Sequence, residues 1–350
     1  MSTKNADPPS TGSSSPGRFP IVCVGASAGG VEALQAFTAA LPADLAACVV
    51  VVLHLPGDAP SQLAELLAAN CALPVRFIED GTPCAPGEVQ VLPPGYSVAF
   101  EGEHLRLADR PPDERWRPVD RLFTSLADEV GDCAVAVVLS GTGTNGSVAL
   151  GRLRAAGALV LAQDPAEAEF KDMPRNALAT GHVERAAPCA ELARIIVDWG
   201  VCLPSLIEER ERATDTIDQI LAFVRAHTGR DFRSYKPGTI ERRIQRRAGM
   251  CRCRRLADYC SLLREDEQEI ENLARDLLIG VTAFFRDPAT WQVLDEVILP
   301  QLIADADEAE PFRAWVGGCA SGEEAYSLAI LVHEARTCCR GRRRCSCGNP

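Results

Sequence analysis

Three short polar segments follow three apolar runs, and they carry side chains that could cleave an ester. The first run leads into a glycine-rich turn that holds Ser27. The valine-rich run Cys48–Leu53 ends at His54, and Val135–Leu139 leads into the segment 140–146. In an open parallel sheet the reactive crevice lies at the carboxyl ends of the strands, so these three segments are predicted to converge.

Ser27 has the spacing of a nucleophile on a tight strand-to-helix turn. It stands in a G-x-S-x-G pattern, where small flanking residues permit a sharp turn and let a substrate approach. The following helix N-terminus offers free N–H groups to a developing oxyanion. His54 would take the serine proton and return it to the leaving group, and Asn145 falls in the slot of the residue that orients the imidazole.

Other interpretations fit each segment taken alone. Gly25-x-Ser27-x-x-Gly30 is also a degraded phosphate or dinucleotide cradle, and its spacing fits a hydrolase and a nucleotide cradle equally well. A lone histidine is more often structural, and Asn145-Gly146 is a turn dipeptide. The occurrence of three such features at three strand ends favours the hydrolase.

The surrounding pattern predicts an α/β fold. Short β-branched runs alternate with helical stretches over residues 19–202, which is typical of a mainly parallel sheet covered on both faces, that is, three layers. The Pro- and Gly-rich stretch Val75–Leu107 predicts hairpins or an antiparallel edge. Residues 1–18 are rich in Ser, Pro and Gly and are predicted to be a disordered lead-in.

Composition limits the classes of protein to consider. The 350 residues suit two or more domains, and no apolar run reaches the ~20 residues that a membrane span needs. The net charge of −12 argues against a general nucleic-acid binder. With fifteen cysteines and no secretory signal, a reducing cytoplasm is a better expectation than a disulfide framework.

A different pattern begins after a predicted linker at 203–213. Residues 214–288 have helical spacing with few strand signals, which predicts a small all-α domain. One of its helices carries a stripe of arginines at i,i+4 spacing, namely Arg242, Arg243, Arg246 and Arg247. The stripe is either a solvated face that offsets a nearby acidic stretch or a docking surface for an acidic partner.

The segment 289–337 begins a third pattern. Phe312–Val316 is predicted to be a strand, followed by a glycine turn at Gly317-Gly318 and a helix that runs to about Ala335. Such a turn lets a nucleotide-like ligand approach the backbone, although many α/β folds begin with a turn of this kind.

Residues 19–202 closely resemble the catalytic domain of CheB-type protein-glutamate methylesterases. The motifs that carry the resemblance are Val24–Gly30, Val52–Pro56, Pro86–Gly95, Val119–Phe123, Val138–Gly146 and Met173–Gly181. The resemblance implies hydrolysis of glutamate γ-methyl esters on chemoreceptors, without a cofactor, through a Ser-His-Asp triad. Ser27 matches the nucleophile and His54 the base, and we expect Ala28, Thr142 and Gly143 to support the turn and the oxyanion.

The chain departs from that family's pattern at two places. The triad aspartate falls on Asn145, which supplies no negative charge to an imidazolium and can hold the wrong tautomer, so the esterase is predicted to be weak or idle. Only about 18 residues precede the first predicted strand, so the family's phosphorylatable receiver domain is not expected to control this chain.

Residues 214–335 resemble the N-terminal half of CheR-type protein-glutamate methyltransferases. Gly280–Asp287 matches the family's signature segment and Gly318–Ser327 its S-adenosylmethionine loop. By that resemblance Thr282, Arg286, Gly318 and Glu324 would bind S-adenosylmethionine, and the arginine stripe would hold an acidic receptor helix.

The residues after Ala335 do not continue the methyltransferase pattern. They are rich in Arg and Cys without a strand period, and residues 338–350 are predicted to be an atypical, irregular tail. A single βα unit cannot cover both faces of its strand, so the expected fold is the first unit of an incomplete Rossmann-like domain, with feeble cofactor binding. A zinc site at Cys338, Cys339, Cys345 and Cys347 is an alternative, but the spacing is not that of paired C-x-x-C knuckles, and no metal is predicted.

Together these patterns predict a fusion that acts in receptor-methylation signalling in the cytoplasm. The expected partners are methyl-accepting chemoreceptors or similar signalling proteins, including histidine kinases, with no nucleic acid and no membrane insertion. The alternatives are a non-enzymatic docking protein and a nucleotide-binding first domain.

Overall fold

The chain divides into two compact units, residues 1–278 and 279–350. The computed structural model describes residues 19–54, 61–110, 117–210, 213–278, 284–285, 288–305, 312–319 and 322–346. In this described part, no helix is both long and apolar enough to cross a bilayer. Each cysteine whose side chain is described carries a free thiol.

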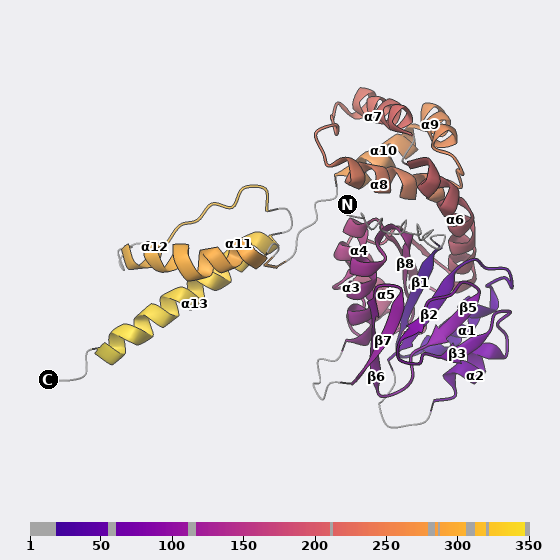
Figure 1. The fold of residues 1–350 in the computed structure, drawn as a ribbon, viewed down its shortest axis with the longest axis horizontal. Coiled ribbons are helices and arrows are strands. Elements are labelled where there is room, and N and C mark those ends of the chain that lie inside the picture. The colour runs from indigo at the N-terminus through magenta and orange to yellow at the C-terminus, as the bar shows by residue number, and fades with distance from the viewer. Residues whose placement is uncertain are drawn as a thin grey trace, which may run out of the picture. The chain divides into compact units, whose positions relative to one another are not determined.

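A seven-stranded parallel sheet organises the first unit (Figure 1). Its strand order is β10-β9-β8-β1-β2-β5-β3, so the strands that carry Ser27 and His54 are central neighbours. The strands are β1 (Ile21–Ala26), β2 (Cys48–Leu53), β3 (Val75–Phe77), β5 (Glu88–Val91), β8 (Ala134–Val138), β9 (Leu159–Gln163) and β10 (Arg185–Ala187). β1, β2 and β8 are buried along their whole length, because helices or a second sheet cover both faces.

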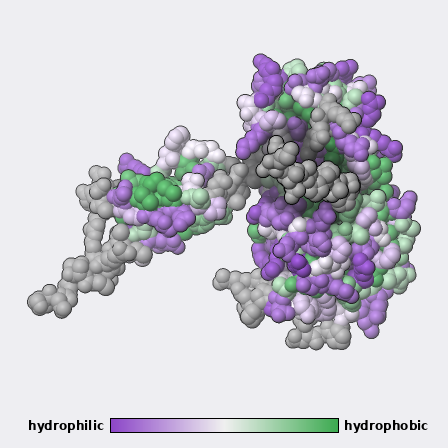
Figure 2. Space-filling model, viewed as in Figure 1, coloured by the Kyte–Doolittle hydropathy of each residue, from purple (hydrophilic) through white to green (hydrophobic). Residues whose placement is uncertain are grey.

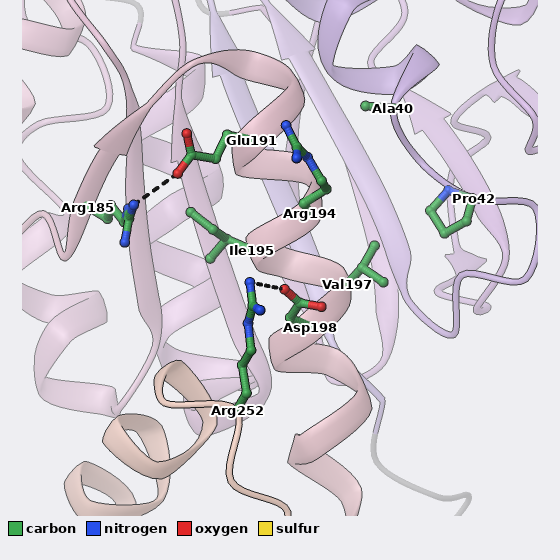
Figure 3. A pocket seen from close by; sticks show the side chains of 9 residues that line it. All are labelled: Ala40, Pro42, Arg185, Glu191, Arg194, Ile195, Val197, Asp198 and Arg252. Carbon is green, nitrogen blue, oxygen red and sulfur yellow. Dashed lines mark hydrogen bonds and ion pairs between the residues drawn. The ribbon is translucent and has the colours of Figure 1, made fainter.

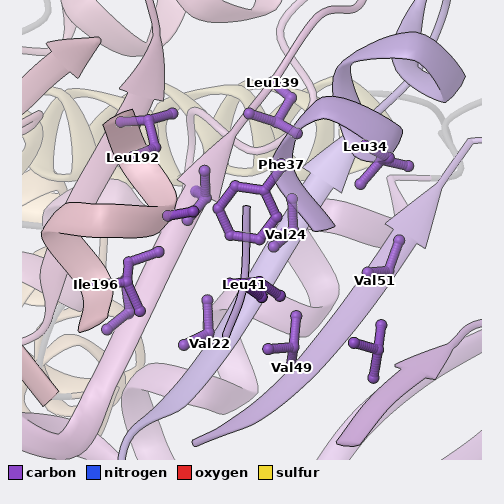
Figure 4. Packing of buried hydrophobic residues seen from close by; sticks show 14 of the residues in the cluster. Val22, Val24, Leu34, Phe37, Leu41, Val49, Val51, Leu139, Leu192 and Ile196 are labelled. Atoms are coloured by element: carbon purple, nitrogen blue, oxygen red, sulfur yellow. The ribbon is translucent and has the colours of Figure 1, made fainter. Parts of the chain in front are cut away.

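Two apolar cores lie on the two faces of this sheet. On one face, β1 and β2 present Val22, Val24, Val49 and Val51 to Phe37 and to other apolar side chains of α1 (Gly30–Ala39) and α6 (Cys189–Arg210), as Figure 4 shows. The alternate residues of the same strands face α3 (Pro118–Glu129), α4 (Leu150–Ala156) and α5 (Asp172–Ala179). The predicted three-layer α/β fold is therefore confirmed.

The stretch Val75–Leu107 was predicted to form hairpins or an antiparallel edge, and the structure divides it between two sheets. β6 (Tyr96–Glu101), β7 (His104–Asp109) and β4 (Thr82–Pro83) form a separate antiparallel sheet. β3 and β5 instead extend the parallel sheet beside β2, with α2 (Leu63–Ala68) preceding them.

Four helices follow the α/β layers within the same unit and enclose their own apolar core. They are α7 (Thr214–Thr228), α8 (Pro237–Met250), α9 (Leu256–Glu265) and α10 (Glu267–Leu277). We call them the helical module. Residues 203–210 of the predicted linker are helical, because α6 continues through them, and the Trp199 ring of α6 packs against Gly249 of α8.

The second unit consists of helices in its described residues. They are α11 (Pro288–Val293), the π-helical turn η2 (Leu294–Ile298), α12 (Leu299–Asp305) and α13 (Glu323–Ser346). The predicted strand Phe312–Val316 is not formed, since the described residues of this unit provide no strand to pair with it. The prediction of an irregular tail is also wrong up to Ser346, where α13 ends.

The surfaces of the two units differ in character. Figure 2 shows mostly hydrophilic side chains on the visible face of the first unit and an apolar patch on the second. Exposed apolar side chains of the second unit include Val293, Val297, Leu302, Trp315 and Tyr326.

Candidate functional site

The structure brings the three predicted polar segments to one end of the sheet. The backbone N–H of His54 donates to the carbonyl oxygen of Ala26 at 3.0 Å, directly before Ser27. The N–H of Ser27 donates to the carbonyl oxygen of Ser140 at 2.9 Å, at the end of β8. Ser27, His54 and the segment 141–146 therefore share the carboxyl edge of β1, β2 and β8.

The turn after Ser27 leaves hydrogen-bond donors open. Gly29 has a left-handed backbone (φ 63°), and α1 begins at Gly30 without a side-chain cap. Among the described residues, no acceptor pairs with the N–H of Ala28 or Gly29, while the N–H of Gly30 returns to the carbonyl oxygen of Ser27 at 2.9 Å. Two free amides at a helix N-terminus are suited to a developing negative charge.

Ser140 holds this turn against the end of β8. Its hydroxyl donates to the carbonyl oxygen of Ala28 at 3.0 Å and accepts the N–H of Phe170 at 3.0 Å, while its own N–H donates to Gln163 at 2.9 Å. Neither Ser140 nor Gln163 was among the predicted site residues. Only their position in the sequence could have indicated this role, since each residue stands at or just after the end of a strand.

Gly141 explains how the turn and the glycine segment approach so closely. A Cβ atom at Gly141 would lie 2.9 Å from the Cβ of Ser27 and still closer to the sulfur of Met173, so a larger residue would push the two segments apart. Thr142 and Gly143 follow on the surface, and the side chain of Asn176 donates to the carbonyl oxygen of Gly143 at 2.7 Å.

Asn145 is buried and bound to α3. Its Oδ1 accepts the backbone N–H of Asp120 at 3.2 Å, and its Nδ2 has no hydrogen-bond partner in the described part of the chain. Because only an oxygen can accept from that N–H, the orientation of the amide is fixed, and the atom left over is a donor. The structure thus engages one lone pair of the Asn145 oxygen with α3 and leaves a buried N–H donor on the same side chain.

Asp120 was missed as a residue that positions this segment. One carboxylate oxygen accepts the N–H of Val148 at 3.0 Å, and the other lies 3.4 Å from Arg117, whose guanidinium also donates to Thr144. Burial raises the pKa of the Asp120 carboxyl, partly opposed by these N–H donors and by Arg117. Residues 117–120 therefore fix the segment that carries Asn145.

His54 is tuned toward its neutral form. Burial lowers the pKa of its imidazole from the usual 6.5, and the positive charge of Arg110 lowers that pKa further. A neutral imidazole at physiological pH is the form that a general base requires.

The predicted docking stripe on α8 is largely buried, and that prediction is wrong for Arg243 and Arg246, which are only 4% and 2% exposed. Arg246 pairs with Asp276 at 2.7 Å, and Arg247 donates to Glu269 at 2.9 Å. Arg242, also in the predicted stripe, packs beside Gly157.

Some of the charged side chains that interact with the buried arginines of α8 belong to the α/β layers. Arg154 of α4 pairs with Asp276 and with Glu184, which precedes β10, and Arg246 lies 3.7 Å from Glu184. We call Arg154, Glu184, Arg246 and Asp276 the buried ion cluster. Glu184 and Gly157 lie at the amino ends of β10 and β9, whereas Ser27 follows the carboxyl end of β1. The helical module therefore packs against the end of the strands opposite to Ser27.

The predicted S-adenosylmethionine residues are only partly described. Thr282 and Arg286 lie outside the described residues. Gly318 has a left-handed backbone (φ 75°), and Glu324 is exposed in the first turn of α13. The described residues thus provide a glycine turn and a helix start without the strand that would support them, so they form an incomplete cofactor site.

A surface pocket of about 460 Å³ lies elsewhere on the first unit (Figure 3). Two surface ion pairs line it, Arg185 with Glu191 at 2.9 Å and Arg252 with Asp198 at 2.7 Å. These pairs neutralise most of its charge, and none of the predicted catalytic residues lines it.

Three family profiles match the chain in order. The CheB methylesterase profile matches residues 22–196, the CheR methyltransferase all-alpha domain matches residues 215–278, and the CheR methyltransferase SAM binding domain matches residues 280–343. The matches fall on the α/β layers, on the helical module and on the second unit, respectively.

Individual relatives agree with these profiles. A Rhodobacter capsulatus protein described as an uncharacterized 104.1 kDa protein in the hypE 3′ region is 37% identical over 298 residues, covering 78% of this chain and 31% of that protein. A protein-glutamate methylesterase/protein-glutamine glutaminase of Geobacter metallireducens is 35% identical over 184 residues, or 51% of this chain and 50% of that enzyme. The chain thus spans half or less of the length of these relatives.

A solved structure is also similar, that of the Thermotoga maritima CheB methylesterase catalytic domain. It has 25% sequence identity and a TM-score of 0.48, and the match covers 51% of this chain and 98% of that one. Since the CheB profile alone covers half of its residues, the chain belongs to the CheB methylesterase family, with CheR-type all-alpha and partial SAM-binding domains fused behind the esterase domain.

Proposed function

We propose that the first unit hydrolyses glutamate γ-methyl esters on chemoreceptor-like proteins. The observation that carries the proposal is the shared strand edge, where Ser27 and His54 follow neighbouring strands and two open amides stand behind the serine. Family membership supports the same reaction class. We place this activity in chemotaxis-type signal transduction in the cytoplasm, with the CheR-type domains as a methyltransferase-like module.

In this proposal the reaction has two halves. The hydroxyl oxygen of Ser27 attacks the ester carbonyl while His54 takes its proton, and the amides of Ala28 and Gly29 bind the oxyanion. The imidazolium then protonates the departing methoxide, so methanol leaves and a glutamyl ester on Ser27 remains. Water, deprotonated by His54, attacks that ester, and the serine recovers its proton as the glutamate carboxylate departs.

Ser27→Ala should abolish methanol release from a peptide that bears a glutamate γ-methyl ester, because no other group supplies the attacking oxygen. The comparison is made in the natural chain and in the Asn145→Asp background, so that a slow basal rate does not hide the loss. Ser261→Ala, on the exposed side of α9, is the matched control and should hydrolyse at the parental rate. Equal rates with and without Ser27 would remove the serine from the reaction.

The pH dependence of ester hydrolysis should reflect the tuned imidazole. Since burial and Arg110 lower the pKa of His54, the acid limb of kcat/KM should have its midpoint below 6.5. Arg110→Gln should move that midpoint upward, because it removes a repelling charge while leaving the burial. A midpoint at or above 6.5 in the natural chain would contradict the assignment of His54 as the base.

A second candidate function is non-enzymatic docking on receptors or kinases. The observation that favours it is the neutral amide of Asn145, which is bound to Asp120 and supplies no negative charge to an imidazolium at His54. A docking protein would bind receptor fragments equally well with or without Ser27 and would release no methanol in either background.

A further inference from the structure

The side chains of Glu169 and Phe170 flank the serine turn from a neighbouring loop. A Cβ atom placed on Gly29 would lie 2.7 Å from a carboxylate oxygen of Glu169 and 2.8 Å from the Phe170 ring, so both side chains pack directly on the turn. Gly29 is two residues after Ser27 and donates one of the two open amides. Both flanking side chains remain exposed.

The backbone holds this loop in place on both sides. The N–H of Phe170 donates to the hydroxyl of Ser140 at 3.0 Å, and the carbonyl oxygen of Phe170 accepts the N–H of Gly141 at 3.0 Å. The same Ser140 hydroxyl donates to the carbonyl oxygen of Ala28. These bonds hold the backbone of the loop beside the turn, and the exposed carboxylate of Glu169 lies next to Gly29 at the positive end of α1.

We propose that Glu169 is a specificity-determining residue, which selects methyl esters in neutral or basic surroundings and disfavours acidic ones. This inference rests on the proposed esterase function. The negative charge of Glu169 at the rim raises the energy of any further carboxylate that enters. Its effect on the oxyanion is common to all ester substrates and cancels when two peptides are compared. The same repulsion acts on the product, because hydrolysis converts the neutral ester into a carboxylate at that place.

The expected size of the effect follows from Coulomb's law. Two like charges several ångströms apart at a partly solvated site change an equilibrium or rate by about 3- to 10-fold. Salt screens such an interaction, so the preference should shrink as ionic strength rises. The half-exposed Phe170 ring offers an apolar contact to the methylenes of the glutamyl side chain and is indifferent to charge.

The test compares two peptide methyl esters that differ only in the residues beside the esterified glutamate, which are aspartates in one and alanines in the other. The ratio of their kcat/KM values in the Asn145→Asp background should favour the neutral peptide by about 3- to 10-fold. Glu169→Gln should bring the ratio near one, and Glu169→Lys should reverse it. Glu103→Gln, in the exposed β6–β7 turn, removes an equal charge away from the site and should keep the parental ratio.

A binding measurement separates this inference from the proposed activity. In Ser27→Ala protein, calorimetric titration should show weaker binding of the product carboxylate peptide than of its methyl ester, and Glu169→Gln should reduce that difference. If the Glu169→Gln protein still hydrolyses the esters through Ser27 and keeps the parental preference between the two peptides, the proposed role of Glu169 is wrong and the esterase function stands. Glu169-dependent binding without hydrolysis would overturn the esterase and keep the charge selection.

Discussion

Asn145→Asp should raise the turnover of glutamate methyl-ester hydrolysis by up to roughly 10⁴-fold, the factor lost when a serine protease exchanges its triad aspartate for asparagine. The oxygen of the natural amide already accepts the N–H of Asp120, and the amide carries no negative charge to stabilise an imidazolium. A carboxylate at this position could accept from Asp120 with one oxygen and from the imidazole with the other. It would also stabilise the imidazolium that forms during attack.

The measurement is methanol release at saturating substrate, and Asn70→Asp is its control. Asn70 is exposed beyond α2, so that variant adds the same charge without reaching the site. Equal and full activity of the natural chain and the Asn145→Asp protein would show that the amide already orients His54. Activity in neither, with intact folding, would favour the docking function.

Asp276→Ala should destabilise the first unit by about 3–5 kcal/mol, because it leaves buried guanidinium groups without their shared carboxylate. The carboxylate of Asp276 pairs with Arg154 and Arg246, and its backbone carbonyl oxygen accepts from Arg243. Burial lowers the pKa of Arg154 and Arg246, and the negative charge of Asp276 opposes that shift in both. Glu184 alone would then face two buried cations.

Asp198→Ala provides the contrast within the same chain. Its pair with Arg252 has a similar distance of 2.7 Å but is 40% and 72% exposed, so we expect less than about 1 kcal/mol from its loss. Urea denaturation followed by circular dichroism gives both values. If Asp276→Ala shifts the midpoint no further than Asp198→Ala, the buried ion cluster does not hold the helical module on the sheet.

The α/β layers could be predicted from the sequence because parallel strands that are buried on both faces consist of nearly continuous apolar residues. Cys48–Leu53 and Val135–Leu139 correspond to β2 and β8 with shifts of one residue at most. Phe312–Val316 has the same appearance but forms no strand, since strand formation depends on a pairing partner that a local pattern does not contain. Residues 203–213 were predicted to be a linker, yet α6 continues through Pro204 to Arg210.

The site could be predicted wherever chemistry coincided with a strand end. Ser27 and His54 were selected in this way, and the structure places both at one end of the sheet, whereas Asp120 and Ser140 act through backbone hydrogen bonds that no residue pattern indicates. Helical spacing correctly placed the arginines on one face of α8. The helical spacing could not show whether that face is buried or exposed, because its burial depends on Glu184 and Asp276, which are remote in sequence.

The continuous helix α6 has a mechanical consequence. It runs unbroken from Cys189, which packs against the sheet, to Arg210 at the border of the helical module, and its 22 residues span about 33 Å. The α/β layers and the helical module are therefore expected to move together as one rigid unit, and not as two domains joined by a flexible linker. For a partner that binds both parts, this fixed spacing sets the effective concentration of the second contact. A partner whose two binding sites match the spacing would gain affinity, and one whose sites do not match would gain none.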